Sequence, residues 1–273
     1  YNSKKSEIFY SIQTNGTLVT DEWAIFFREN KFLVGLSLDG DFEGNRFRVD
    51  EKRQNSYYKI IKAADKFKKH RVEFNILTVL TGYCAENAER IYKYFRDNSF
   101  KYIQFIPCLR PMGDDTESEL YMTNDQYADF LIRIFNLCVK DFVRGNYISI
   151  RQFDNWVRMY LGERAEQCGL MGHCTHQFVA EGNGNIYPCD FYCTDEWLLG
   201  NINESSLESM ANGDKARQFI MESLGVSKEC KECRFYPICR AGGCKRNRES
   251  ENYCVAYKRF FGACLPLFRA FRK

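Results

Sequence analysis

A cysteine-rich stretch between residues 168 and 254 constrains this sequence more than any other feature. It contains a first block of three cysteines and a second block of four, with one more cysteine ten residues later. In order, these cysteines are Cys168, Cys174, Cys189, Cys230, Cys233, Cys239, Cys244 and Cys254. Thiolates are the soft ligands that zinc and iron–sulfur clusters select, and eight of them are enough for two four-ligand sites. We therefore expect two metal sites in this part of the chain.

The spacing of the cysteines helps to separate the two kinds of metal site. A zinc ribbon normally uses two close pairs of cysteines, but here Cys230 and Cys233 form the only close pair. A cubane cluster has a larger inorganic core, which spans longer gaps. The spacing favours iron–sulfur clusters, with zinc as the alternative. Four further cysteines lie in helical or strand patterns and are expected to be free structural residues: Cys84, Cys108, Cys138 and Cys264. Cys193 lies close to the first block, and its spacing assigns it no role.

The overall composition excludes several classes of protein. The chain has 273 residues and a net charge of +3, which gives no indication of binding to nucleic acid or to a membrane surface. No apolar run approaches the roughly 20 residues of a spanning helix, and the first residues show no signal-peptide pattern. Because the chain is large and carries no export signal, we expect reduced thiols and a cytoplasmic protein. The sequence does not begin with Met, so we expect a fragment of a longer protein.

Strand and helix patterns alternate along the first 160 or so residues. Strands are expected at 8–16, 33–40, 73–80, 102–107 and 147–152, and helices at 21–30, 54–70, 86–98, 123–144 and 154–161. Thr20 is a candidate N-cap, and Thr123 with Gln126 makes a capping box. Strands that alternate with helices indicate crossover units and a parallel sheet. We therefore expect the α/β class, with an open or partial barrel.

Polar residues recur on one face of the predicted strands, where a fully buried parallel sheet would be apolar. Because side chains alternate between the two faces of a strand, these residues can line one concave surface. The candidates for cofactor or substrate binding are Gln13, Asn15, Ser37, Asp39, Asn75 and Gln104. Three of them lie near the carboxyl ends of strands, where (β/α) barrels place their sites. Asn15-Gly16 and Asp39-Gly40 are also good turn dipeptides, so bonding to turn backbone is the alternative for Asn15 and Asp39.

Asp190 directly follows Cys189, and two roles are open for it. Its carboxylate can accept hydrogen bonds from the backbone amides of its own loop. It can also be a catalytic acid or base, because carboxyl groups in dry pockets near metal sites often serve this purpose. The sequence does not distinguish the two roles. His173 and His176 flank Cys174 and are not assigned as ligands, because the cysteines suffice.

Several motifs resemble those of known families. Cys174, Gly184 and Cys189, followed by Cys-x2-Cys-x5-Cys and two later cysteines, resemble the SPASM domain of radical SAM peptide-modifying enzymes. Five segments are similar to the anaerobic sulfatase-maturating enzymes: Q-T-N-G at 13–16, G-L-S-L-D-G at 35–40, F-N-I-L-T-V at 74–79, Q-F-I-P at 104–107 and Y-P-C-D-F at 187–191. The resemblance covers nearly the whole chain, and the combined pattern is very specific.

The resemblance implies ligands for two auxiliary [4Fe–4S] clusters. Matched by motif, Cys168, Cys174, Cys189 and Cys244 would hold the first cluster, and Cys230, Cys233, Cys239 and Cys254 the second. Asp190 matches the aspartate that takes a proton from the substrate residue, and Gln13 matches a residue of the substrate and cofactor pocket. The implied domains are a partial radical SAM (β/α) barrel without its first strands, over 1–162, and a SPASM domain with a C-terminal helix, over 163–273.

Two features depart from the family pattern. Four residues instead of three separate Cys239 from Cys244, and a Gly-Gly loop can absorb the extra one. The Cys-x3-Cys-x2-Cys loop, which binds the cluster that cleaves S-adenosylmethionine, does not occur in these 273 residues, and neither does the Gly-Gly-Glu-Pro segment that follows it. We therefore expect an N-terminally truncated chain that does not start a radical by itself.

The function implied by the resemblance is that of a radical SAM oxidoreductase that converts a Cys or Ser of a sulfatase into formylglycine. The full enzyme would also use S-adenosylmethionine and a third [4Fe–4S] cluster, with a sulfatase polypeptide and an electron donor such as a flavodoxin or ferredoxin as partners. A monomer without nucleic-acid or membrane contacts is expected. The alternatives are a maturase of another ribosomal peptide, or an inactive metal-stabilised peptide-binding module. The basic aromatic tail from Tyr257 to Phe271 is expected to pack on the SPASM domain, with membrane contact as the alternative.

Overall fold

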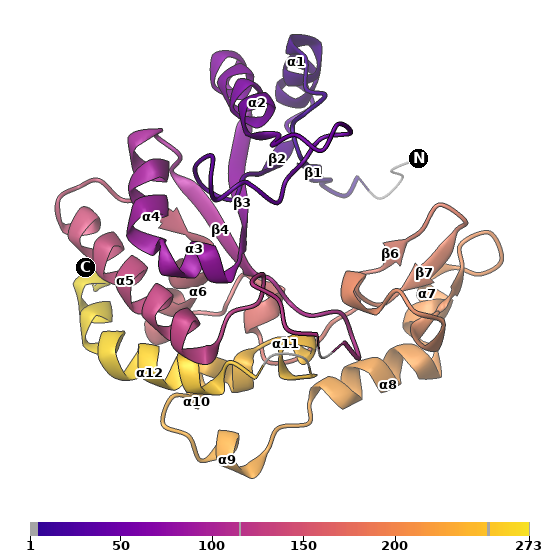
Figure 1. Cartoon of the computed structure of the whole chain (residues 1–273). Helices are drawn as coiled ribbons and strands as arrows, with labels where there is room; N and C mark the ends of the chain where they lie inside the picture. Colours follow the sequence, from indigo (N-terminus) through magenta and orange to yellow (C-terminus); the bar gives the residue numbers. More distant parts are fainter. Residues whose placement is uncertain (1–4, 115, 250–251, 273) are drawn as a thin grey trace.

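The computed structural model describes residues 5–114, 116–249 and 252–272. A parallel sheet with its helices forms the larger part of the structure, and a lobe with a small sheet of its own lies beside it (Figure 1). Within the described ranges, no helix is long and apolar enough to cross a membrane.

Five parallel strands follow one another across the larger sheet in the order of the sequence. They are β1 (Ser11–Thr14), β2 (Leu33–Ser37), β3 (Glu73–Leu80), β4 (Tyr102–Pro107) and β5 (Ser149–Ile150). The connecting helices are α1 (Asp21–Glu29), α2 (Tyr57–His70), α3 (Gly82–Glu86), α4 (Ala88–Asp97) and α5 (Asn124–Val143). Figure 1 shows these helices along the outer side of a curved sheet. Parallel strands joined by helical crossovers confirm the predicted α/β class.

Local sequence signals correctly locate several element ends. The Thr20 hydroxyl accepts a hydrogen bond from the backbone N–H of Trp23 (3.3 Å) at the start of α1. Thr123 and Gln126 make both bonds of the capping box at the start of α5. Such a cap stabilises a helix by about 1 kcal/mol. β3 and β4 also have their predicted bounds, whereas β1 and β2 are shorter than predicted.

Two predictions are wrong in detail. β5 is limited to two residues, because α6 (Arg151–Tyr160) begins directly after it, three residues before the predicted helix start at 154. α3 is a helix that the apolar periodicity did not indicate. It is too short to show a period, and its start depends on a cap, since the Thr81 hydroxyl accepts a hydrogen bond from the backbone N–H of Cys84 (3.3 Å).

The C-terminal tail packs mainly on the barrel helix α5. It consists of α12 (Cys254–Cys264) and η5 (Leu265–Phe271), and α12 runs along α5 in Figure 1. The ring centre of Phe135 on α5 lies 5.5 Å from that of Phe260 and 4.8 Å from that of Phe268. This arrangement corrects the expected packing on the SPASM domain. Because these rings are buried in the main core, they do not form a membrane-facing surface.

The cysteine-rich lobe is built from short elements. Its antiparallel sheet contains β6 (Val179–Ala180), β7 (Asn185–Tyr187) and β8 (Gly200–Asn201). Its helices are α7 (Leu207–Ala211), α8 (Asp214–Ser223), α9 (Lys228–Lys231), α10 (Tyr236–Cys239) and α11 (Lys245–Glu249), with 3-10 turns η1 (Cys168–Leu170), η2 (Asp190–Tyr192), η3 (Asp195–Trp197) and η4 (Arg240–Gly242). A second, small core contains Cys174, Tyr192, Trp197 and Phe219. With so little regular backbone pairing, the lobe depends on side-chain contacts to offset its ordering entropy.

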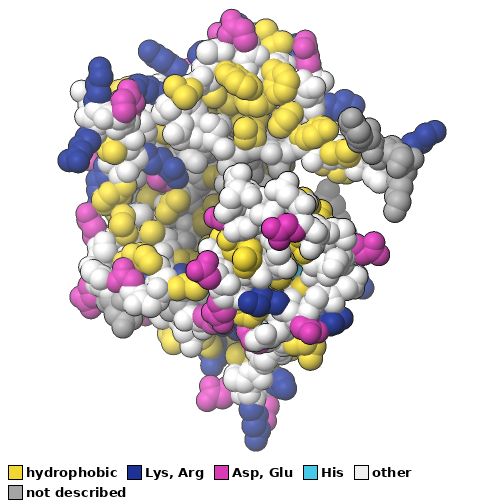
Figure 2. All heavy atoms as spheres, turned by 90° about the vertical axis from the view of Figure 1, so that its right-hand side faces the viewer, with side chains coloured by type: hydrophobic (Ala, Val, Ile, Leu, Met, Phe, Trp, Pro, Cys, Tyr) yellow, Lys and Arg dark blue, Asp and Glu magenta, His cyan; other side chains and the backbone are white. Residues whose placement is uncertain are grey.

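The surface near β1 and α1 is apolar. Figure 2 views the right-hand side of Figure 1 and shows hydrophobic side chains gathered in its upper part, above the lobe. Exposed apolar residues of this region are Ile8, Phe9, Tyr10, Trp23 and Phe26. Large contiguous apolar patches are uncommon on the surfaces of soluble domains.

Candidate metal-cluster sites and active site

The structure brings together four cysteines from distant parts of the lobe. Cys168 begins η1, Cys174 follows in a loop, Cys189 directly precedes η2, and Cys244 directly precedes α11. Burial raises the pKa of the Cys168 thiol, and the nearby Cys244 and Cys174 raise it further. Burial also raises the pKa of Cys189 to about 12. Because thiolates so close together repel one another, a bound cation would stabilise their deprotonated form.

The other four predicted ligands line a cavity of about 380 Å³. Cys230 lies in α9, Cys233 in the turn after it, Cys239 at the end of α10 and Cys254 at the start of α12. Aromatic residues form part of the wall: Phe235, Tyr236, Tyr253, Tyr257 and Phe261. Burial, with a contribution from the three other thiols, raises the pKa of the Cys239 thiol to about 11. Four soft donors around one cavity fit an iron–sulfur cluster.

The remaining cysteines lie outside these two groups. Cys84, Cys138 and Cys264 are buried, and Cys108 is half-buried. The Cys193 thiol donates a hydrogen bond to the backbone carbonyl of Cys189 (3.7 Å). All thirteen cysteines lie in the described part of the chain, and none of them forms a disulfide. In the described part of the chain, no three His, Cys, Asp or Glu side chains form a site for a single metal ion. The fit to clusters therefore rests on the two four-thiol groups themselves.

Asp190 lies beside the first cysteine group. Its Oδ1 atom accepts hydrogen bonds from the Cys189 thiol (3.2 Å) and from the backbone N–H of Phe191 (3.1 Å). The bond from Phe191 is the contact expected if Asp190 only accepts hydrogen bonds from the amides of its own loop. The residue is also exposed to solvent, so a substrate can reach it. This geometry accommodates both predicted roles of Asp190.

Strand register places four predicted polar residues on one face of the sheet. Gln13 of β1 is aligned with Gly35 of β2, and Gly35 with Asn75 of β3. Ser37 and Gln104 belong to the next row, on either side of a leucine of β3. A Cβ atom on Gly35 would lie 2.6 Å from that leucine's side chain and 3.4 Å from Cγ of Gln13. The glycine therefore leaves room for the leucine side chain, which packs against it beside Gln13.

Two predicted site residues are engaged in bonds within the fold. Oε1 of Gln104 accepts a hydrogen bond from Nη1 of Arg151 (3.0 Å), and Arg151 also pairs with Glu166 (3.2 Å). Oδ1 of Asn15 accepts hydrogen bonds from the backbone N–H (3.1 Å) and the hydroxyl (2.9 Å) of Thr17. The second arrangement matches the turn interpretation of Asn15. No sequence pattern indicated Arg151, because it lies 47 residues from its partner Gln104.

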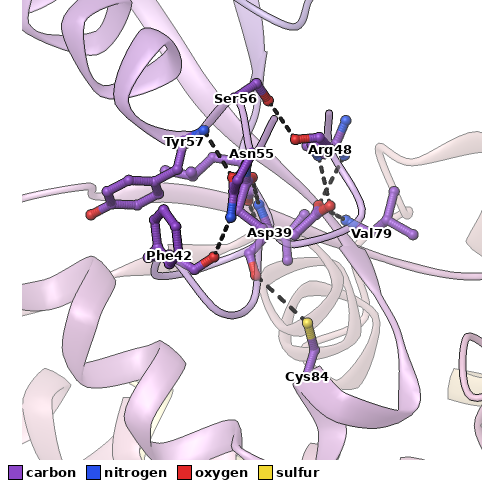
Figure 3. Close-up of polar contacts among 11 residues, drawn as sticks. Asp39, Phe42, Arg48, Asn55, Ser56, Tyr57, Val79 and Cys84 are labelled. Carbon is purple, nitrogen blue, oxygen red and sulfur yellow. Dashed lines mark hydrogen bonds and ion pairs between the residues drawn. The ribbon is translucent and has the colours of Figure 1, made fainter. Parts of the chain in front are cut away.

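Asp39 is held inside the fold beyond the end of β2 (Figure 3). Nε and Nη2 of Arg48 donate to its two carboxylate oxygens at 2.6 and 2.9 Å, and the backbone N–H of Val79 donates at 2.7 Å. The exposed fraction of the side chain is 7% for Asp39 and 22% for Arg48. Burial raises the pKa of Asp39, and both Arg48 and the Val79 N–H oppose this shift. With both oxygens occupied, the geometry favours the alternative that Asp39 bonds within the fold.

The loop between β2 and α2 is organised around this ion pair. Asn55 donates from Nδ2 to the carbonyl of Phe42 (2.8 Å) and accepts from the backbone N–H of Tyr57 (3.0 Å). The Ser56 hydroxyl donates to the carbonyl of Arg48 (2.8 Å). Figure 3 shows these bonds on one side of Asp39, with Cys84 below it. The ion pair therefore fixes the loop at the carboxyl end of the sheet, where the candidate site lies.

Replacing Arg48 by methionine is expected to lower the free energy of unfolding by about 3 kcal/mol at neutral pH, because Asp39 would keep a buried charge without its partner. Loss of Arg48 raises the folded-state pKa of Asp39 further, since Arg48 opposes the effect of burial. The destabilisation is complete above that pKa and disappears as the pH falls below the pKa of Asp39 in the wild-type fold, because the unfolded chains titrate alike. Denaturant titrations at several pH values measure it.

The double variant Asp39→Asn/Arg48→Met is the matched control for this experiment. It removes both charges, so most of the lost stability should return. A loss of stability that is the same at every pH, or that the double variant does not reverse, would contradict the ion-pair explanation.

The cysteine-rich lobe matches the SPASM family model, described as an iron–sulfur cluster-binding domain, over residues 171–234. Two cysteine-type anaerobic sulfatase-maturating enzymes, from Clostridium novyi and Clostridium perfringens, are 41% and 42% identical to this chain. The matches cover 96% and 97% of this chain, and 72% and 74% of those enzymes. The chain belongs to the anaerobic sulfatase-maturating enzymes. A serine-type member from Bacteroides thetaiotaomicron is 34% identical over 96% of this chain and 69% of its own length.

A solved member of the same family has the same fold. The structure of native anSMEcpe with bound AdoMet matches with a TM-score of 0.94 and 41% identity, over 98% of this chain and 76% of that chain. The same protein with bound AdoMet and Kp18Cys peptide matches equally well. This similarity confirms a partial radical SAM barrel followed by a SPASM domain. Sulfatase-maturating enzymes use iron–sulfur clusters together with S-adenosylmethionine, which confirms the expected cofactors.

Proposed function

We propose that this chain provides the substrate-oxidising surface and the auxiliary-cluster lobe of an anaerobic sulfatase maturase. Such an enzyme is a radical SAM oxidoreductase that converts a cysteine or serine of a sulfatase into formylglycine. Identity of 41–42% to cysteine-type members over 96–97% of the chain carries this assignment. The two groups of four thiols support it independently, because they are the donor sets that iron–sulfur clusters need.

We assign one auxiliary [4Fe–4S] cluster to each cysteine group. The ligands of the first would be Cys168, Cys174, Cys189 and Cys244, and those of the second Cys230, Cys233, Cys239 and Cys254. Bound clusters of this type supply a one-electron acceptor close to the substrate. The protein would hold the thiols in place, and aromatic side chains are among those that line the cavity of the second group.

Asp190 is the proposed base. A base has to come within hydrogen-bond reach of the proton that it removes, here the proton on the substrate's thiol or hydroxyl group. The exposed carboxylate of Asp190, next to the first cysteine group, meets this requirement. Oδ1 is already held by the backbone N–H of Phe191, which fixes the orientation of the carboxylate.

The polar face of the sheet is the proposed contact surface for S-adenosylmethionine and the substrate. Gln13, Ser37 and Asn75 lie on this face in register. Gln104 lies on the same face and is oriented by Arg151. We assign Asn15 and Asp39 a supporting role, because their turn and loop bonds shape the carboxyl end of the sheet.

The proposal also includes the partners and the organisation of the chain. The substrate is a sulfatase polypeptide, and the peptide bound by anSMEcpe supports a substrate of this kind. An electron donor of the flavodoxin or ferredoxin type, a monomeric state and a cytoplasmic location complete the proposal. We place the boundary between the barrel and the SPASM lobe at residues 162 and 163, shortly after α6.

Cysteine is the proposed target residue, because identity to cysteine-type members (41–42%) exceeds identity to a serine-type member (34%). In an active enzyme that contains this chain, we expect aldehyde to form on a sulfatase peptide with cysteine at the target position. The matching serine peptide should react at least about tenfold more slowly, which corresponds to a barrier difference of ~1.4 kcal/mol. Mass spectrometry of hydrazone-trapped aldehyde measures both rates, with an alanine peptide as the control. Equal or faster reaction of the serine peptide would reverse this choice.

A further inference from the structure

Lys245 is a buried lysine for which the proposed function has no role. It directly follows Cys244 at the start of α11, and 8% of its side chain is exposed. Its ammonium nitrogen lies over three aromatic rings, 4.8 Å from the ring centre of Tyr192, 4.9 Å from that of Trp197 and 5.6 Å from that of Phe219. Lysine is almost never buried to this extent unless it is paired, so its surroundings require an explanation.

Two carboxylates complete the surroundings of the Lys245 ammonium group. Nζ lies 3.0 Å from a carboxylate oxygen of Glu249 and 3.2 Å from one of Glu222. The Tyr192 hydroxyl donates a hydrogen bond to Glu249 as well. Glu249 belongs to α11, Glu222 to α8 and Tyr192 to η2. A single charged group therefore links three separate segments of the lobe.

Each of these three segments positions one proposed ligand of the first cluster. Cys244 directly precedes α11, and Cys189 directly precedes η2. The backbone N–H of Cys174 donates to the Ser223 hydroxyl oxygen (2.8 Å), which lies at the end of α8. Arg248 of α11 strengthens this link by donating to the carbonyl of Ser223 (2.6 Å). The contacts of Lys245 thus determine how three of the four thiols are placed relative to one another.

We propose that Lys245 is the positioning residue that assembles the ligands of the first auxiliary cluster. An apolar side chain of the same length would fill the space among the rings of Tyr192, Trp197 and Phe219. Buried ion pairs can often be replaced by apolar residues without loss of stability. Packing alone therefore does not require a lysine here. The charge of Lys245 orients two carboxylates, because the ammonium group holds Glu222 and Glu249 at fixed points around the rings. This inference rests on the proposed role of the four thiols as ligands.

The test compares Lys245→Met with Lys215→Met after anaerobic reconstitution of the whole chain with iron and sulfide. Methionine keeps the length and apolar stem of lysine and removes the charge. Lys215 is an exposed lysine on α8 of the same lobe, so its variant is a matched control. We expect wild type and Lys215→Met to hold about eight irons per chain, and Lys245→Met about four, because each cluster contains four. Electron paramagnetic resonance of the reduced proteins should show that the signal of one cluster is missing in Lys245→Met.

Lys245→Arg keeps the charge and should hold clearly more iron than Lys245→Met. Full iron content and an unchanged spectrum in Lys245→Met would overturn the inference, and so would loss of both clusters, which indicates general unfolding. Equal loss in Lys245→Arg and Lys245→Met would contradict the role of the charge. Cys174→Ala separates this inference from the proposed function. If Cys174→Ala also keeps all its iron, the ligand assignment itself fails, whereas loss in Cys174→Ala but not in Lys245→Met refutes the positioning role alone.

Discussion

Replacing Asp190 by asparagine is expected to stop aldehyde formation, while cleavage of S-adenosylmethionine continues, in an active enzyme that contains this chain. The variant loses the base but keeps the shape of the side chain. Its amide oxygen can still accept the hydrogen bond from the backbone N–H of Phe191, so the loop should stay in place. Because general bases typically contribute about 10²–10⁴-fold to a rate, we expect at least about 100-fold less product.

One assay should measure cofactor cleavage and aldehyde yield together, because their ratio separates loss of the base from loss of the fold. Asp195→Asn is the matched control, since Asp195 is an exposed carboxylate on the neighbouring turn η3. It should leave both values near those of the wild type. The same result for Asp190→Asn would remove Asp190 from the mechanism and leave it with its loop contact only. Equal loss of both activities would instead indicate a structural role.

Features that depend on residues close together in the sequence could be predicted from it. The capping box of Thr123 and Gln126 needs residues three positions apart, and it forms as expected. The bounds of β3 and β4 follow from short apolar runs with a polar residue on one face. The alternation also predicted that Gln13 and Asn75 share a face, which the strand register shows. The composition of the two thiol groups came from the family resemblance, and their spacing alone did not determine it.

Contacts between distant segments could not be predicted. The segment K-R-N-R that begins at Lys245 has the composition of an exposed helix, yet Lys245 is buried because aromatic residues from three other segments surround it. The position of Gln104 on β4 indicated a polar site, but its partner Arg151 lies at the start of α6, beyond α5 and β5. Asp39 resembled a site residue for the same reason, whereas Arg48 occupies both of its oxygens. Periodicity describes one segment at a time and gives no information on such pairs.

Removal of one thiol from the second group, by Cys233→Ala, is expected to lower the iron content from about eight to about four per chain. Cys233 lies between α9 and α10 and shares its cavity with Cys254 on α12. A cluster held by these thiols would connect the short helices of the lobe to α12, which packs on the barrel helix α5. Because metal binding to loops of this kind contributes directly to folding, the variant should also be less stable.

A loss of about 3 kcal/mol would lower the Tm of a chain of this size by about 6–12 °C. Calorimetry and iron analysis of the anaerobically reconstituted protein measure the two effects together. Cys193→Ala is the matched control, because Cys193 is also half-buried in the lobe but lies outside both proposed ligand groups. It should keep all its iron and nearly all its stability. Full iron content and an unchanged Tm in Cys233→Ala would show that Cys233 is not a ligand. A colourless wild-type protein that binds zinc in place of iron would refute both cluster sites, because the argument for Cys233 depends on a bound core large enough to link α9, α10 and α12.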